Sequence, residues 1–245
     1  LDLLLLIGKL DEPGCGFAPL AEENNDQGAI EMGTITELLP GAQPITNGTE
    51  RERIAKQWKG ELPTDKGASL IEMLERARAG SLKAMFIVGE NPVGSLPAVI
   101  HAEASLRNLD LLVCQELFLT ETAALAHVVL PAASSLEKHG TFTNTEGHVQ
   151  AVRPAIEPVG DSRPDWEIFS ALSILLNSPM EYAESKEILK EIRSLIPGYS
   201  SLGPTPLPPK VDRSAMDRYL TDGYQRDLAT RYHPISRVSR PDGTV

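Results

Sequence analysis

The chain has 245 residues, of which 41% are hydrophobic and 23% are charged, and its formal net charge is -11. This composition allows a large buried core and is ordinary for a globular protein. The negative charge argues against a nucleic-acid-binding protein, which needs basic residues to neutralise phosphates, and against docking on anionic lipid.

The first apolar segment, LDLLLLIGKL, ends a helix at Gly8 and is too short to cross a bilayer, which needs roughly 20 apolar residues. It also lacks the basic start and cleavage site of a signal peptide. We therefore expect no direct membrane insertion and a cytoplasmic location, either free or at the inner face of the cell membrane through partner subunits. Because the chain opens with leucine inside a helical pattern, we expect a fragment of a longer protein.

Residues 1–49 form a loop-rich segment, since Gly, Pro and Asn are dense there. Two helices are predicted within residues 50–80, the second with Leu70, Leu74 and Ala77 on one face and Gly80 at its C-terminus.

Three apolar runs follow, at residues 84–88, 109–114 and 128–130, separated by predicted helices at 97–107 and 120–126. Strands that are apolar throughout are typical of a parallel sheet covered by helices on both faces. The fold class is therefore α/β, and ligands of such sheets bind at the carboxyl ends of the strands.

The remaining residues are predicted to be a loop at 132–163, a helix at 164–176 that begins with Pro164, and a helix within 177–196. A Pro-rich linker at 197–211 and a helical tail and arm at 212–245 complete the chain. The nucleotide-binding α/β half is expected to span residues 50–176.

No complete catalytic motif is present, so no catalytic residue is assigned. The two cysteines, Cys15 and Cys114, and the five histidines lack metal-ligand spacing. We expect no metal site and no cysteine-ligated iron–sulfur cluster within this chain.

Small polar residues at the predicted strand ends are the candidates for ligand binding. They are Gly89, Asn91, Gln115, Glu116 and Thr120. Glycine lets a ligand approach the backbone, and Thr120 precedes a helix N-terminus that suits a phosphate. From spacing alone the alternative also stands that Thr120 only caps its helix and that Asn91 only begins a turn.

The blocks GENP, TETA, VVLPAAS, GTFTNTEG and PDW occur in an order and spacing that resembles the molybdopterin oxidoreductase family. The similarity is greatest to the large iron–sulfur subunit of NADH:quinone oxidoreductase (its G subunit) and to the alpha chain of NAD-linked formate dehydrogenase. PGCG and NNDQGAIEMG resemble the upstream loop of the same proteins, so that the resemblance covers residues 1–176.

The resemblance implies a dinucleotide-binding-like domain that holds one guanosine end of bis-molybdopterin guanine dinucleotide. Asn91 would contact that cofactor, Gln115 and Glu116 would lie at the guanosine end, and Lys138 and Asp165 would be polar contacts of the same nucleotide. A lysine suits a pyrophosphate as a point charge, and an aspartate can accept guanine N–H groups.

Two positions depart from the family pattern, which usually has aspartate at His127 and arginine at His148. The leading expectation is a part of the large subunit of NADH:quinone oxidoreductase, mainly a scaffold, in a complex I-type electron-transfer assembly. The alternatives are the cofactor-binding part of a formate dehydrogenase-like enzyme and a non-redox interaction module. In the first two cases the partners are other subunits of the complex, and this chain alone is expected to be inactive.

Overall fold

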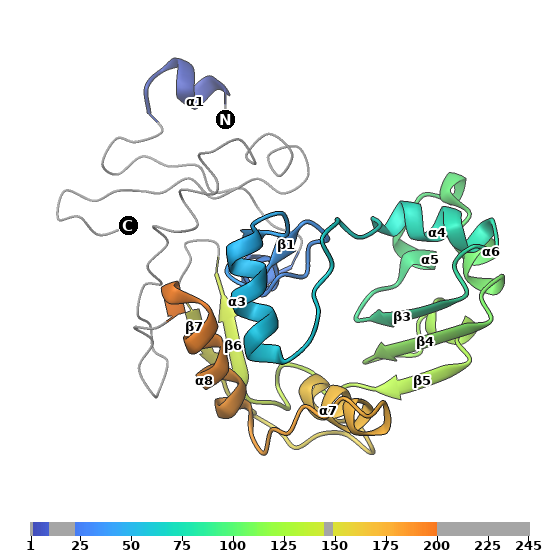
Figure 1. Ribbon diagram of the computed structural model, residues 1–245. Helices are drawn as coiled ribbons and strands as arrows, with labels where there is room; N and C mark the ends of the chain where they lie inside the picture. The colour runs from blue at the N-terminus through green and yellow to red at the C-terminus, as the bar shows by residue number, and fades with distance from the viewer. Residues whose placement is uncertain (1, 10–22, 145–148, 200–245) are drawn as a thin grey trace. The chain divides into compact units, whose positions relative to one another are not determined.

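The computed structural model describes residues 2–9, 23–144 and 149–199 (Figure 1). Cys15, His148, the predicted tail and most of the predicted Pro-rich linker lie outside these residues. The chain forms two compact units, each built from separate segments. Unit 1 contains the described residues of Leu1–Lys66, Gly140–Ala151 and Lys186–Val245, and unit 2 contains Gly67–His139 and Val152–Ser185.

Unit 2 is built on a three-stranded parallel sheet of order β3-β4-β5, as the alternation of apolar runs and helices predicts. The strands are β3 (Ala84–Val88), β4 (Leu111–Glu116) and β5 (Val128–Pro131). In the register, Val88 lies opposite Gln115, and Gln115 lies opposite Leu130. All three carboxyl ends therefore share one edge of the sheet.

The helices of unit 2 are α4 (Leu70–Arg78), α5 (Pro92–Ser95), η1 (Ala98–Ile100), α6 (Ala102–Arg107), η2 (Ala123–Leu125) and α7 (Asp165–Leu175). Ser69 and Glu72 cap α4 reciprocally through side-chain-to-backbone hydrogen bonds. Gly80 ends the same helix with a φ of 73°, the left-handed conformation that glycine adopts without strain. The predicted C-terminus of this helix is confirmed.

The single helix predicted at 97–107 is wrong. The segment contains η1 and then α6, because His101 between them has a left-handed φ of 53°. A residue in this conformation breaks the helical hydrogen-bond ladder, so α6 begins at Ala102. The helix predicted at 120–126 is also shorter, and only the 3₁₀ turn η2 forms.

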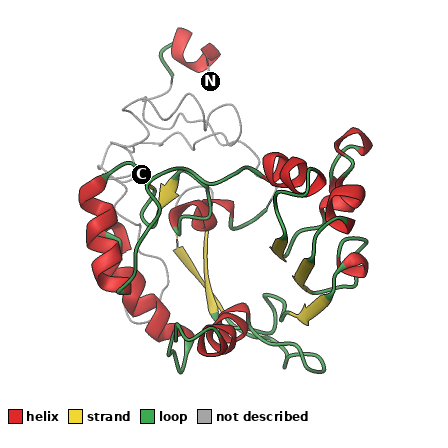
Figure 2. Cartoon of the chain, turned by 45° about the vertical axis from the view of Figure 1, so that its right-hand side comes forward, coloured by secondary structure: helices red, strands yellow, loops and turns green. Residues whose placement is uncertain are grey.

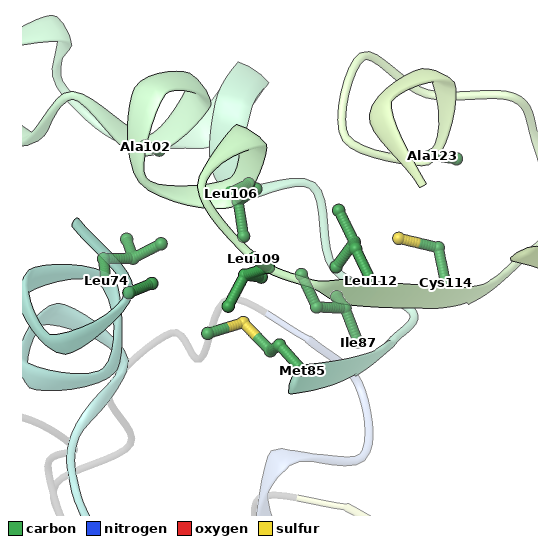
Figure 3. Close-up of a cluster of buried hydrophobic side chains, with 10 residues drawn as sticks. Leu74, Met85, Ile87, Ala102, Leu106, Leu109, Leu112, Cys114 and Ala123 are labelled. Atoms are coloured by element: carbon green, nitrogen blue, oxygen red, sulfur yellow. The ribbon is translucent and has the colours of Figure 1, made fainter. Parts of the chain in front are cut away.

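The core of unit 2 lies on one face of the sheet, beneath α4, α6 and η2 (Figure 3). The side chains of Met85, Ile87, Leu112 and Cys114 lie on the face of β3 and β4 that packs in one cluster with Leu106 of α6. Leu112 has no exposed surface. Burying a leucine stabilises the fold by about 2 kcal/mol, so this face anchors the strands that carry the site.

The opposite face of the sheet is apolar and less covered. Phe86 of β3 packs against Phe169 of α7 with ring centroids 5.9 Å apart. Phe86, Val88 and Val128 nevertheless remain 40%, 39% and 44% exposed. The uninterrupted apolar character of the strands thus reflects one buried face and one that α7 covers in part.

Unit 1 contains elements within segments that were predicted to be loops (Figure 2). These are α2 (Asp26–Glu31), β1 (Leu38–Leu39) paired with β2 (Gln43–Pro44), and β6 (Gly140–Thr143) paired with β7 (Val149–Val152). The other elements are α1 (Asp2–Leu6), α3 (Gly48–Trp58), α8 (Ser185–Leu195) and η3 (Pro197–Tyr199). The helices predicted within 50–80 and 177–196 thus occur as α3, α4 and α8.

The core of unit 1 gathers residues far apart in sequence, among them Ile54, Val149 and Tyr199. Beside it, the buried Glu31 carboxylate accepts hydrogen bonds from the Tyr199 hydroxyl and from Gln27 Nε2. Hydrogen bonds from several donors allow a carboxylate to be buried. In the parts of the chain that the structure describes, no helix is long and apolar enough to span a membrane.

Candidate functional site

Three of the predicted polar residues meet at the carboxyl edge of the sheet in unit 2, where two of them contact the carboxylate of the third, Asp165. Asp165 begins α7, and its Oδ1 accepts a hydrogen bond of 2.7 Å from Gln115 Nε2. Its Oδ2 forms an ion pair with Lys138 Nζ. We call Gln115, Lys138 and Asp165 the carboxylate triad. Its members come from β4, the loop after β5 and the first turn of α7, so the fold brings distant segments together.

The carboxylate triad contains an unused hydrogen-bond acceptor. Gln115 is fully buried. A carboxylate only accepts hydrogen bonds, so the Gln115 amide must turn its nitrogen toward Asp165 and its oxygen away. That oxygen, Oε1, is buried and has no hydrogen-bond partner among the described residues. A buried acceptor without a donor costs about 1–3 kcal/mol.

Asn91 forms a second cluster with the TETA segment. Its Oδ1 accepts hydrogen bonds from Thr122 N at 3.1 Å and Thr122 Oγ1 at 2.8 Å, and its Nδ2 donates to Glu121 Oε2 at 2.7 Å. This last bond holds the pKa of Glu121 below its ordinary value. A Cβ at Gly94 would lie 2.4 Å from Asn91 Nδ2, so glycine leaves the amide its space. Asn91 therefore clamps the loop after β3 to the loop after β4.

The other predicted residues lie at the same edge with different partners. Gly89 has a φ of 63°, and its N–H donates to the Gln115 carbonyl at 2.9 Å. A Cβ there would meet nothing within 4 Å, so the backbone faces open space. Glu116 follows Gln115 in β4 and therefore points to the opposite face, where its Oε1 accepts a hydrogen bond from Leu117 N. Thr120 Oγ1 accepts one from Ala123 N, the first residue of η2, at 3.2 Å, while the N-cap position of η2 is Thr122.

Sequence reasoning missed Glu137 and Thr122. Glu137 is 8% exposed, and its carboxylate accepts hydrogen bonds from Ser134 N at 2.7 Å and Val159 N at 3.0 Å. The Ser134 N–H in particular lowers the pKa of Glu137. Glu137 thereby fixes the loop that carries Lys138. The only signal in the sequence was the position of Glu137 beside a candidate residue.

His127 and Cys114 both have structural surroundings. His127 Nδ1 accepts a hydrogen bond of 2.9 Å from Leu112 N, so the ring extends the pairing of β4 and β5. Burial, followed by the negative charge of Glu116, raises the pKa of the Cys114 thiol. Among the residues that the structure describes, no three His, Cys, Asp or Glu side chains are grouped to hold a metal ion.

Comparison with known proteins relates this architecture to a family of redox enzymes. The profile described as "Molybdopterin oxidoreductase" matches residues 1–174. The F420-dependent formate dehydrogenase subunit alpha of Methanocaldococcus jannaschii is 40% identical over 203 residues, which are 82% of this chain and 30% of that protein. The G 2 subunit of the NADH-quinone oxidoreductase of Rhizobium meliloti is 39% identical over 202 residues, 82% of this chain and 23% of that protein.

Two further similarities extend the comparison. The "Probable oxidoreductase YjgC" of Bacillus subtilis is 39% identical over 82% of this chain and 20% of that protein. Among solved structures, acetylene hydratase from Pelobacter acetylenicus matches with a TM-score of 0.47 and 21% identity, over 68% of this chain and 22% of that chain. The chain spans 20% to 30% of the length of the curated relatives named here. Since the family profile covers most of its length, the chain belongs to the molybdopterin oxidoreductase family.

Proposed function

We propose that this chain is the part of a molybdopterin-dependent oxidoreductase of the formate dehydrogenase type that holds a guanosine end of molybdopterin guanine dinucleotide. The observation that carries the proposal is the carboxylate triad with its unpaired acceptor, Gln115 Oε1. A polypeptide that served only as a scaffold would gain stability from an apolar side chain at this buried position. A buried amide oxygen without a donor is instead suited to a ligand that brings one.

The residues present fit the nucleotide end of the cofactor. Guanine carries adjacent N1–H and N2–H donors, and Asp165 and Gln115 supply acceptors. Gly89 and its open surroundings allow a ligand to approach the backbone at the same edge of the sheet. When bound, the cofactor would supply two-electron redox chemistry at its metal. The role of this chain is then to bind and orient one end of the cofactor.

A second candidate is the scaffold of an NADH:quinone oxidoreductase large subunit. The observation that favours it is His127, which stands where the family usually has aspartate and whose ring is hydrogen-bonded to the β4 backbone. The similarity to the G 2 subunit of Rhizobium meliloti supports it further. In this case electrons would pass through clusters elsewhere in the large subunit. In both cases we expect the other subunits of a redox complex as partners and a cytoplasmic location.

Metal analysis of the full-length protein, purified from its native source, distinguishes the two candidates. About one molybdenum per chain supports the cofactor-binding function and contradicts the scaffold. A molybdenum-free protein that copurifies with NADH-oxidising subunits supports the scaffold. A protein that elutes alone and without molybdenum contradicts both and indicates an interaction module. The 245-residue chain alone should show neither formate oxidation nor NADH:ferricyanide activity.

A further inference from the structure

The last two helical elements of the described chain pack on unit 1 as a separate segment. Ser185–Tyr199 contains α8 and η3, and we call it the α8–η3 strap (Figure 1). Its apolar side packs in the cluster of Ile54 and consists of Leu189, Ile192, Leu195 and Ile196. Residues 174–181, which connect unit 2 to the strap, are all exposed. The strap can therefore leave unit 1 without disturbing the core of unit 2.

The outer contacts of the strap are hydrogen bonds from α3. Trp58 Nε1 donates to Glu191 Oε1 at 2.9 Å, and Arg53 Nη2 donates to the Leu195 carbonyl at 2.7 Å. Trp58 is 45% exposed and the Arg53 side chain is 37% exposed. Because water can replace either partner at such exposed positions, these two bonds hold the strap only weakly.

The inner end of the strap is held by a buried contact. The Tyr199 hydroxyl donates a hydrogen bond to the Glu31 carboxylate, and Glu31 and Tyr199 are 0% and 2% exposed. Thr143 Oγ1 of β6 lies 3.2 Å from the Tyr199 hydroxyl oxygen and donates to Glu31 Oε2 at 3.4 Å. The Thr143 N–H donates to Asn25 Oδ1 at 2.9 Å. The strap, α2 and β6 thus meet at one carboxylate, whose burial is unfavourable unless its donors are in place.

The strap also contacts a turn with a strained backbone. Ala42, between β1 and β2, has a φ of 53° and is 3% exposed. The left-handed conformation is unfavourable for alanine and persists where the surrounding structure holds it. A Cβ at the neighbouring Gly41 would lie 3.4 Å from Ile196 Cγ2, so the turn lies against the strap. Gly41 N donates to the Glu31 carbonyl at 2.7 Å, and Glu31 therefore connects the turn with Tyr199.

We propose that the α8–η3 strap opens and closes on unit 1 as one element, and that the contact between Tyr199 and Glu31 controls this opening. With the strap closed, Glu31 is paired and the β1–β2 turn keeps its strained backbone. With the strap open, the carboxylate loses the Tyr199 hydroxyl and the turn loses Ile196. Release of the strap and relaxation of the turn are then a single step, because the same contacts maintain both.

The test is hydrogen–deuterium exchange of the 245-residue chain, measured by mass spectrometry of its peptides. In wild type, the amides of the strap and of the β1–β2 turn should exchange at one common rate, faster than those of α3 and of β4. Tyr199→Phe removes only the hydroxyl and should accelerate exchange in the strap and the turn about tenfold, since a hydrogen bond to a buried charge is lost. Exchange in β4 should not change.

Two further variants isolate the contact. In a Glu31→Gln background, Tyr199→Phe should have a smaller effect, because the hydroxyl then faces a neutral amide. Ser194→Ala is the control. It removes a hydroxyl from the same helix, where Ser194 Oγ donates to the Glu191 carbonyl, and it should change neither rate.

Each other outcome contradicts the proposal. Unchanged exchange in Tyr199→Phe shows that the contact does not control the strap. Acceleration of the strap without the turn shows that α8 frays alone. Equal acceleration of the strap, the turn and α3 shows that unit 1 unfolds as a whole. If Tyr199→Phe does not fold, the wild-type rates still decide, because different rates for the strap and the turn exclude a common opening.

Discussion

The clamp between Asn91 and Thr122 should stabilise unit 2 through hydrogen bonds more than through volume. Thr122 has no exposed surface. Its hydroxyl donates a hydrogen bond to Asn91 Oδ1 at 2.8 Å, and the hydroxyl oxygen, Thr122 Oγ1, accepts one from Val93 N at 3.1 Å. Thr122→Val keeps the shape of the side chain but removes both hydrogen bonds. At about 1 kcal/mol for each, the free energy of unfolding should fall by about 2 kcal/mol.

Thr122→Ser is the matched control, because it keeps the hydroxyl and removes only a methyl group. The loss of one buried methyl should cost about 1 kcal/mol. The hydrogen-bond argument therefore predicts that valine is more damaging than serine, although valine is the closer replacement in volume. A further control is Asn91→Ala, whose effect should be less than additive with that of Thr122→Val because both remove the same contact.

The assay is urea unfolding followed by the fluorescence of Trp166 in a Trp58→Phe background, since Trp166 lies in α7 of unit 2. For a slope of about 2 kcal/mol per molar urea, the midpoint should fall by about 1 M for Thr122→Val and about half as much for Thr122→Ser. If the serine variant is the less stable of the two, packing and not hydrogen bonding holds this loop, and the reasoning fails.

Two further substitutions and one labelling experiment test other parts of unit 2. Leu112→Ala should lower the free energy of unfolding by about 2–5 kcal/mol in the same urea assay, because the side chain has no exposed surface; a loss below about 1 kcal/mol would contradict the assigned core. Glu137→Gln should remove the contribution of this ionised carboxylate to the free energy of unfolding. That contribution is fully present above the ordinary carboxyl pKa of 4.5 and is lost as pH falls through the lowered pKa of the folded state. The difference in melting temperature between wild type and variant should therefore shrink between about pH 6 and pH 3, and a constant difference would refute the argument. Because burial raises the pKa of the Cys114 thiol, this residue should resist labelling by a thiol reagent at pH 7.5 until urea unfolds the chain. Mass spectrometry of the Cys114 peptide measures the labelling, and rapid labelling of the folded chain would contradict the prediction.

The sequence was sufficient to predict the sheet of unit 2 because its signals are local. Each strand is a short apolar run bounded by polar turns, and the helix before the first strand carries its own end signals, Ser69 and Gly80. The break at His101 was not predictable, since no glycine or proline occupies that position. Its left-handed backbone ends η1 and begins α6 at the same residue.

Unit 1 was predicted poorly because its structure depends on contacts between distant residues. An acidic helix residue such as Glu31 is ordinarily on a solvated face, but here Tyr199, 168 residues away in the sequence, satisfies the carboxylate. β6 and β7 lie within residues 132–163, where the glycines and prolines of the sequence predicted a loop. Only the burial of Val149 against Ile54 and Tyr199 explains why one of these strands is in the core.

The sequence suggested the residues of the candidate site but not their connections. Strand-end position suggested Gln115, and family resemblance suggested Lys138 and Asp165. That these three form one cluster depends on α7 returning to the sheet 50 residues after Gln115. Gln115 and Glu116 were grouped by adjacency, whereas strand alternation sends their side chains to opposite faces.

The interleaving of the two units has a consequence for synthesis on the ribosome. Unit 2 is complete once residue 185 has emerged, whereas α3 of unit 1 still awaits α8, whose Leu195 carbonyl accepts a hydrogen bond from Arg53 Nη2 at 2.7 Å. The cluster around Ile54 of α3 therefore stays incomplete while more than a hundred further residues are translated, until Leu195, Ile196 and Tyr199 join it. The unit that is begun first closes last, and neither unit can be separated from the other by a single cut in the chain.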